Sequence, residues 1–175
     1  LQFHLADLFE TVAATVPDRL ALISDSLSLT YAELDARSGA LAAGLAANGV
    51  GRGDTVGLYM GNRAEYLEGF IAACKLGAAP FNVNYRYRAD ELRYLFGNAR
   101  AAAIIHAAEY SDVIRSLRGD LPALKATIAV EDGSRADIAG SLAYHDLLKT
   151  PYSGPWARNE SDTLLIYTGG TTGMP

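Results

Sequence analysis

The sequence predicts an α/β fold in which a mostly parallel sheet carries helices on both faces. The main observation is that strand-like and helix-like segments alternate along the chain, which is typical of βαβ units. The length of 175 residues allows about 70% of the unfolded chain's surface to be buried, so a real core can form. The composition, 50% apolar and 20% charged without a repeat or heptad, is that of an ordinary globular domain.

The first expected elements are a helix over 5–16 and a short strand over 20–24. Apolar residues recur at helical spacing at Leu5, Leu8, Val12 and Val16. Pro17 ends the helix, and a Ser- and Asp-rich turn over 25–28 follows the strand.

A second helix is expected to start after Thr30. The Thr30 hydroxyl can accept from the Glu33 N–H while the Glu33 carboxylate reaches back, which is a capping box. The helix has one apolar stripe, formed by Leu34, Leu41 and Leu45. Asn48-Gly49 is a typical helix C-terminus.

The middle of the chain predicts a strand over 55–60 followed by a helix. Asn62 is the expected N-cap, and Gly77 closes the helix. Its apolar residues include Tyr66, Phe70, Ala73 and Leu76. Further strands are predicted over 79–83, 101–106 and 127–130, and further helices over 90–98, 109–117 and 142–148. A connection over 151–159 then leads into a final buried strand over 164–167.

Charge and cysteine content exclude several classes of protein. The 15 basic and 20 acidic residues give a net charge of −5, which argues against a nucleic-acid binder. The alanine-rich run over 40–47 contains Gly44 and is too short to span a bilayer. Cys74 is the only cysteine and is expected to be a buried small hydrophobe. A single cysteine allows no disulfide within the chain, so a reducing cytoplasm is the expected location, and no secretory signal is visible at the start of the sequence.

The segment 168–173 is the candidate functional site. Its three glycines and three threonines offer backbone N–H groups and hydroxyls that can hold phosphate oxygens, at the carboxyl end of a predicted strand. The common P-loop lysine is absent, and no cation lies within 162–175, so Mg²⁺ or a later lysine must complete such a site. A simple turn would use the same residue types.

Other patterns give weaker signals. Gly49 to Gly53 follows a helix and precedes a strand, so a C-cap and tight turn is favoured over a dinucleotide loop. The three histidines are scattered, and no G-x-S-x-G elbow occurs. The segment 84–88 interleaves tyrosines and arginines, and we interpret it as a solvated loop. The alternative is a binding site for an anionic ligand, such as the phosphates of a second substrate.

Three segments in order resemble the adenylate-forming superfamily of acyl-CoA synthetases, peptide-synthetase adenylation domains and luciferases. Leu29 to Leu34 is similar to its L-T-Y-x-E-L motif, and Lys75 to Asn84 to a loose form of K-x-G-A-x-x-x-P-L-N. Tyr167 to Pro175 is similar to its phosphate loop, T-S-G-T-T-G-x-P-K, with Gly169 where serine is usual. The first two segments are expected to be mainly structural.

The resemblance implies the N-terminal part of an AMP-binding domain, spanning 1–175, in the acyl-CoA synthetase-like fold. The family's carboxylate attacks the α-phosphate of Mg-ATP, pyrophosphate leaves, and the acyl group passes to coenzyme A. The residues that would bind the ATP phosphates are Thr168, Gly169, Gly170, Thr171, Thr172 and Gly173. Thr168 is also the candidate near Mg²⁺, and no catalytic residue is expected within the fragment.

The resemblance also implies a finer assignment and leaves alternatives open. Tyr167 to Gly173 with Asn82 to Tyr87 is most similar to bacterial synthetases for fatty or steroid-side-chain acids. The family's loop lysine, later motifs and C-terminal domain would follow Pro175, so the fragment alone is expected to be inactive. An acyl-AMP ligase that loads a carrier protein and a noncatalytic nucleotide-binding domain are the alternatives. Peripheral membrane contact and a homodimer stay open.

Overall fold

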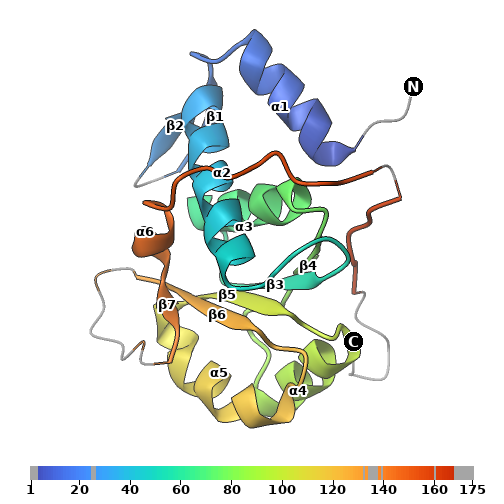
Figure 1. The fold of residues 1–175 in the computed structure, drawn as a ribbon. Helices are drawn as coiled ribbons and strands as arrows, with labels where there is room; N and C mark the ends of the chain where they lie inside the picture. Colours follow the sequence, from blue (N-terminus) through green and yellow to red (C-terminus); the bar gives the residue numbers. More distant parts are fainter. Residues whose placement is uncertain are drawn as a thin grey trace.

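A five-stranded parallel sheet forms the centre of the molecule (Figure 1). The computed structural model describes residues 4–24, 27–131, 133, 138, 140–159 and 161–167. The strands are β3 (Thr55–Tyr59), β4 (Ala79–Asn82), β5 (Ala103–Ala107), β6 (Ala126–Val130) and β7 (Leu142–Ala143). Their spatial order is β4-β3-β5-β6-β7, and every neighbouring pair is parallel. The predicted fold class is confirmed.

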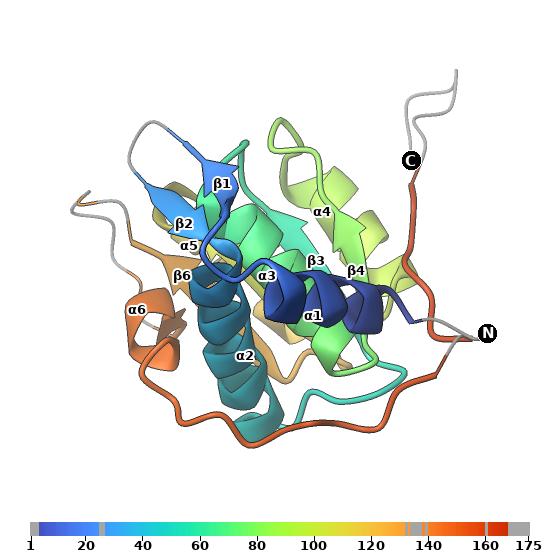
Figure 2. The ribbon, with the colours of Figure 1, turned by 90° about the horizontal axis from the view of Figure 1, so that it is seen from above.

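Helices cover both faces of this sheet. Figure 1 shows one layer that contains α2 (Tyr31–Ala47), α3 (Ala64–Lys75) and α6 (Tyr144–Leu147). The opposite face carries α4 (Ala89–Asn98) and α5 (Ser111–Leu117), with the short 3-10 turns η1 (Ala108–Tyr110) and η2 (Arg118–Asp120). Outside the first layer lie α1 (Leu5–Thr15) and the antiparallel hairpin of β1 (Leu20–Ile23) and β2 (Ser28–Thr30), seen from above in Figure 2.

Alternation along the strands divides the core in two. Val56 and Leu58 of β3 pack with the α2 and α3 side chains, whereas Tyr59 belongs to the core under α4 and α5. A strand that is buried on both faces needs apolar residues at nearly every position. β5 and β6 are buried along their whole length, and this burial explains why both consist mainly of apolar residues.

The predicted helix termini around α2 and α3 are largely confirmed. The Thr30 hydroxyl accepts from the Glu33 N–H at 3.2 Å, and the Glu33 carboxylate accepts from the Thr30 N–H at 2.8 Å. Gly49 and Gly77 end α2 and α3 with φ of +83° and +66°, a region that favours glycine. Asn62 was the wrong N-cap, because Arg63 occupies that position and its side chain makes no capping bond.

Two expectations near the N-terminus need correction. The apolar spacing locates α1 correctly, but Leu5, Leu8 and Val12 are 41–47% exposed, and the buried face of this helix contains Ala6 and Ala13. The turn expected over 25–28 ends earlier, because Ser28 already begins β2. A three-residue strand has no periodicity of its own, and its pairing with β1 decides its structure.

Other boundaries also differ from the expectation. The helix expected over 109–117 is divided into η1 and α5, and the helix expected over 142–148 is preceded by the two-residue strand β7. Cys74 is buried as expected, and burial raises the pKa of its thiol to about 12, so it stays protonated.

The predicted buried strand over 164–167 is wrong. The segment makes one isolated parallel bridge, between Leu165 and Phe81 of β4. Leu164 and Ile166 are 42% and 77% exposed. Apolar residues favour a buried strand only when neighbours cover both faces and an edge, and within the described residues β4 is the only strand that pairs with this segment.

Buried charges connect the outer layer to the helices beneath it. The Lys75 ammonium is 2% exposed and lies 2.7 Å from both Glu10 of α1 and Asp35 of α2. Arg158, in the connection over 151–159, pairs with Asp7 at 2.7 Å and also with Glu10. A buried ammonium needs such partners, since an unpaired one would be very unfavourable. The three carboxylates and two cations are here called the N-terminal ion cluster, which consists of Asp7, Glu10, Asp35, Lys75 and Arg158.

Candidate functional site

The carboxyl ends of β3 and β5 mark the point where the strand order reverses. From β3 the chain passes to β4 on one side, then returns to β5 on the other. Open α/β sheets bind ligands in the crevice outside such a switch point. A hollow of about 500 Å³ lies there, and its lining includes Asn62, Arg63 and Glu65. Arg63 and Glu65 pair at 2.8 Å, and although burial opposes the shift, this contact holds the pKa of Glu65 below its usual value.

A second hollow of about 490 Å³, here called the cleft, adjoins the first through Asn62. It lies at the carboxyl ends of β3 and β4. Its polar lining is provided by the amides of Asn62, Asn82 and Asn84 and by the phenols of Tyr66, Tyr85, Tyr87 and Tyr167. Its apolar lining is provided by Met60, Val83 and Leu95. Amides and aromatic rings orient a ligand by hydrogen bonds and ring contacts.

The described lining of the cleft suits binding better than acid–base chemistry. It contains no carboxylate, imidazole or amine. Burial raises the pKa of Tyr66 and of Tyr167, so both phenols stay neutral near pH 7. The described part of the site therefore supplies positioning groups and no general base at neutral pH.

A buried tyrosine supports the wall of the cleft. The Tyr59 hydroxyl donates to the Tyr87 carbonyl at 2.8 Å, and its ring stacks on Tyr110 with 4.3 Å between ring centroids. Burial raises the pKa of Tyr59 to about 12. The Asn84 side chain accepts from the Arg86 N–H at 3.0 Å, which fixes the turn after β4. These bonds hold the loop over 84–87 against the end of the sheet.

Tyr167 brings the end of the described chain to the cleft. Its ring lies 6.0 Å from the Phe81 ring, and its hydroxyl donates to Asn98 of α4 at 2.7 Å. Upstream, the Leu165 N–H donates to the Pro80 carbonyl at 3.1 Å. The segment therefore runs parallel to β4, toward the same edge of the sheet.

The predicted phosphate-binding residues lie outside the described residues. They are Thr168, Gly169, Gly170, Thr171, Thr172 and Gly173, and the proposed metal contact of Thr168 lies outside as well. Thr168 is bonded to Tyr167, a cleft residue. Asn62, Tyr66 and Asn98 were not predicted from the sequence as site residues. Asn82 and Asn84, polar residues directly after an apolar strand, were the available signal.

The other candidate residues have structural roles. The His4 side chain accepts from the Ala6 N–H at the start of α1, and the buried His106 bonds to the Ala107 carbonyl and to Ser141. Within the described ranges, no three His, Cys, Asp or Glu side chains are arranged to hold a metal ion. Asn48 caps α2, and the Gly51 N–H bonds to Asp54 at 2.8 Å, so the glycines over 49–53 form a cap and turn.

A parallel α/β sheet with polar hollows at the carboxyl ends of its strands has the arrangement in which open α/β domains bind their ligands. A model of the AMP-binding enzyme family matches residues 9–175. The chain belongs to this adenylate-forming family. A 3-oxocholest-4-en-26-oate–CoA ligase from Rhodococcus rhodochrous is 40% identical over all of this chain and 32% of its own length. A medium/long-chain-fatty-acid–CoA/3-oxocholest-4-en-26-oate–CoA ligase from Mycobacterium marinum is 39% identical over 98% of this chain and 33% of its own length.

Solved structures agree with the fold. The anthranilate CoA ligase AuaEII, in complex with anthranoyl-AMP, superposes with a TM-score of 0.90 at 27% identity over all of this chain and 34% of its own. Apo MbtA from Mycobacterium smegmatis gives a TM-score of 0.88 at 29% identity over 99% of this chain and 32% of its own. The chain spans about a third of the length of these curated relatives and structures. Among the described residues, no helix is long and apolar enough to cross a bilayer.

Proposed function

We propose that this chain is the N-terminal part of an ATP-dependent acyl-CoA synthetase. The parent enzyme activates a carboxylic acid as an acyl-adenylate and then forms a thioester with coenzyme A. The proposal rests on the family match over residues 9–175 and on relatives whose names describe CoA ligases. Those relatives also favour an apolar acid, of the fatty or steroid-side-chain class, as the substrate.

One structural observation supports the phosphate-loop proposal in particular. The segment ending at Tyr167 runs beside β4 and enters the cleft at the carboxyl edge. In this proposal, Thr168 to Gly173 donate N–H and hydroxyl bonds to the ATP phosphates. Bonds to a charged acceptor are each worth about 1.5–3 kcal/mol. Mg²⁺ beside Thr168 would neutralise part of the phosphate charge, since the segment has no cation of its own.

The proposed chemistry depends on positioning. A carboxylate oxygen forms a bond to the α-phosphorus of ATP while the bond to pyrophosphate breaks. The coenzyme A thiol then forms a bond to the acyl carbon, and AMP leaves as the acyl–oxygen bond breaks. No covalent enzyme intermediate is needed, so fixed donors around the phosphates contribute chiefly by orientation and electrostatic stabilisation.

Exchange of labelled pyrophosphate into ATP tests the proposal in the full-length parent protein. Exchange should require an apolar carboxylic acid and Mg²⁺. Replacing Thr171 with alanine should lower kcat/KM for ATP about tenfold or more, because a charge-assisted bond is lost. Thr11→Ala is the matched control, since that exposed hydroxyl has the Asp7 carbonyl in α1 as its only hydrogen-bond partner among the described residues. Absence of exchange with every acid of a broad panel would contradict the proposal.

A carrier-protein thiol is the alternative acyl acceptor. One observation favours keeping it: a probable nonribosomal peptide synthetase from Salinispora arenicola is 31% identical over 96% of this chain. If the parent forms acyl-adenylate but gives no thioester with coenzyme A, the carrier-protein acceptor is supported instead.

A further inference from the structure

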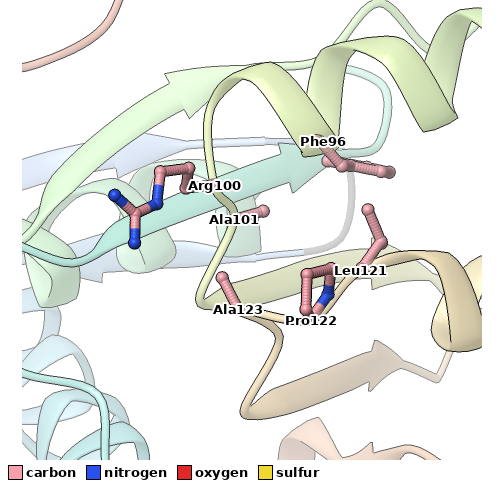
Figure 3. Close-up of a pocket in the computed structure, with 7 residues that line it drawn as sticks. Phe96, Arg100, Ala101, Leu121, Pro122 and Ala123 are labelled. Carbon is pink, nitrogen blue, oxygen red and sulfur yellow. The ribbon is translucent and has the colours of Figure 1, made fainter.

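The opposite edge of the sheet has a hollow of its own. At the amino ends of the strands, a small cavity of about 200 Å³ opens between the end of α4 and the loop over 121–123 (Figure 3). Its apolar walls include Phe96, Ala101 and Leu121, which are 0%, 1% and 5% exposed. Drug-sized cavities measure about 300–1,000 Å³, so this one fits only a short apolar group.

A second hollow of about 540 Å³ continues from the first. The two share Arg100, Pro122 and Ala123. Figure 3 shows Arg100 on one side of Ala101, while Phe96 and Leu121 lie on the other. The two hollows therefore form one groove with an apolar end and a cationic end.

The cationic end has a net positive charge. Lys125 also lines this end, but it is paired with Asp54 at 2.7 Å, and its ammonium donates to the Gly49 carbonyl at 2.9 Å. The Arg100 side chain is exposed and takes part in no hydrogen bond or ion pair within the part of the chain that the structure describes. Arg100 is therefore the group that remains available to an anion.

The backbone of Arg100 is a second, independent observation. Its φ is +51°, and it is the only described residue other than glycine with a positive φ. It follows the C-cap of α4, and the Ala101 N–H closes the turn on the Phe96 carbonyl at 2.9 Å. Glycine or asparagine usually occupies this position, so arginine stands where the helix end alone does not favour it.

We propose that this groove, here called the amino-edge groove, binds a short amphipathic carboxylate. The carboxylate pairs with the Arg100 guanidinium, whose planar fork matches two carboxylate oxygens, and the apolar end lies in the small cavity beside Leu121, Pro122 and Ala123. The site is at the edge of the sheet opposite the cleft, so it is distinct from the proposed adenylation site. It does not depend on the proposed function.

Methyl NMR of the intact protein tests the proposal with hexanoate as the probe. Alanine, leucine and valine methyls are labelled with ¹³C. Saturable shifts are expected at Ala101, Leu121 and Ala123, whereas Val83 and Leu95 report separately on binding in the cleft. Hexylamine, which has the opposite charge, should produce no saturable shift at the methyls of these three groove residues.

Arg100→Gly is the decisive variant, since glycine accepts the positive φ, so the cation and its side chain are removed without straining the backbone. It should weaken hexanoate binding at the groove about tenfold or more, because a charge-assisted bidentate contact is lost. Arg86→Ala, which removes an exposed arginine at the other edge, should leave binding at the groove unchanged. Unshifted groove methyls in the original protein, or equal binding by Arg100→Gly, would overturn the proposal.

Discussion

Arg86 and Arg88 are exposed cations in the loop that lines the cleft. Neither takes part in an ion pair within the described residues, and the Arg86 guanidinium lies 5.4 Å from the centre of the Tyr85 ring. An arginine held against a ring keeps its donors free for an anion. The sequence interpretation as a solvated loop is therefore confirmed, and phosphate binding by the same residues stays a proposal.

We predict that replacing both arginines with alanine raises KM for coenzyme A in the parent enzyme. The expected rise is about tenfold or more, since two contacts to phosphate would be lost. Pyrophosphate exchange should be unchanged, because it precedes the thiol step. Steady-state thioester formation and the exchange assay, measured on the same preparations, check both parts.

Arg93→Ala is the matched control for this prediction. Arg93 is also an exposed arginine near the start of α4, but it is occupied by Asp90 at 2.7 Å and Asp120 at 2.8 Å. Its loss should not change KM for coenzyme A. An equal loss of exchange and thioester formation in the double variant would assign the arginines to the first step or to folding instead.

Gly57 allows β3 and α4 to approach each other. A Cβ atom built there would lie 2.9 Å from the Phe81 ring and 3.0 Å from the Phe96 ring. Both rings are fully buried, and they meet edge to face at 6.3 Å between centroids. We predict that Gly57→Ala lowers the free energy of unfolding by about 1–3 kcal/mol, because a well-packed core accommodates an added methyl group poorly.

Gly97→Ala is the control, since Gly97 lies on the exposed side of α4 and a Cβ there meets nothing within 4 Å. It should raise the free energy of unfolding by up to about 1 kcal/mol through helix propensity. Urea denaturation of both variants gives the comparison. If Gly57→Ala were as stable as the original protein, the packing between β3 and α4 would be looser than the structure indicates.

Elements whose structure depends on local signals could be predicted from the sequence. The capping box at Thr30 and the glycines that end α2 and α3 are set by neighbouring backbone groups, so their residue types determine them. Strand β2 and strand β7 could not be predicted, since two or three residues become a strand only through a distant partner. The buried face of α1 could not be predicted for a related reason. Helical spacing identifies a helix, but it does not identify which neighbours cover it.

The candidate site also has a part that could be predicted from the sequence and a part that could not. The residue types over 168–173 indicate phosphate binding from sequence alone, whereas the cleft draws its lining from five separate segments of chain. The parallel pairing of β3 with β4 brings Asn62 and Asn82 to one edge of the sheet, and the bridge between Leu165 and Phe81 brings Tyr167 to the same edge. These are contacts between distant segments, so the sequence alone does not predict them.

The whole molecule is held together across its layers by the N-terminal ion cluster. Glu10 of α1 accepts from Lys75 of α3 at 2.7 Å and from Arg158 of the connection over 151–159. Figure 2 shows this connection passing outside α2 on its way to the C-terminal segment. The same connection leads to Asp162, which pairs with Arg52 at 2.9 Å, and then to Tyr167. The cluster therefore links α1 to the segment of chain that continues to the cleft.

The lowered pKa of Glu10 makes the N-terminal ion cluster sensitive to acid. Burial opposes ionisation of this carboxyl, but the hydrogen bonds from Arg158 and Lys75 outweigh burial, and the pKa falls below its ordinary value of 4.5. A carboxyl with a lowered folded-state pKa stabilises the protein fully above its unfolded pKa, and this stabilisation is lost as pH falls through the folded pKa. The cluster should therefore hold at neutral pH and weaken below about pH 4.5.

We predict that Glu10→Gln lowers the free energy of unfolding at pH 7 and that its difference from the original protein shrinks as pH falls below 4.5. Glutamine keeps the shape and one carbonyl acceptor, so the variant removes chiefly the charge. Urea denaturation midpoints at several pH values between about 3 and 7, a range that brackets the titration of carboxyl groups, measure the difference.

Asp112→Asn is the control, because that 88% exposed carboxylate forms a surface pair with Arg115 and should change stability by less than about 0.5 kcal/mol. A difference for Glu10→Gln that stays constant across this pH range would show that the Glu10 charge does not stabilise the joint between α1 and the connection.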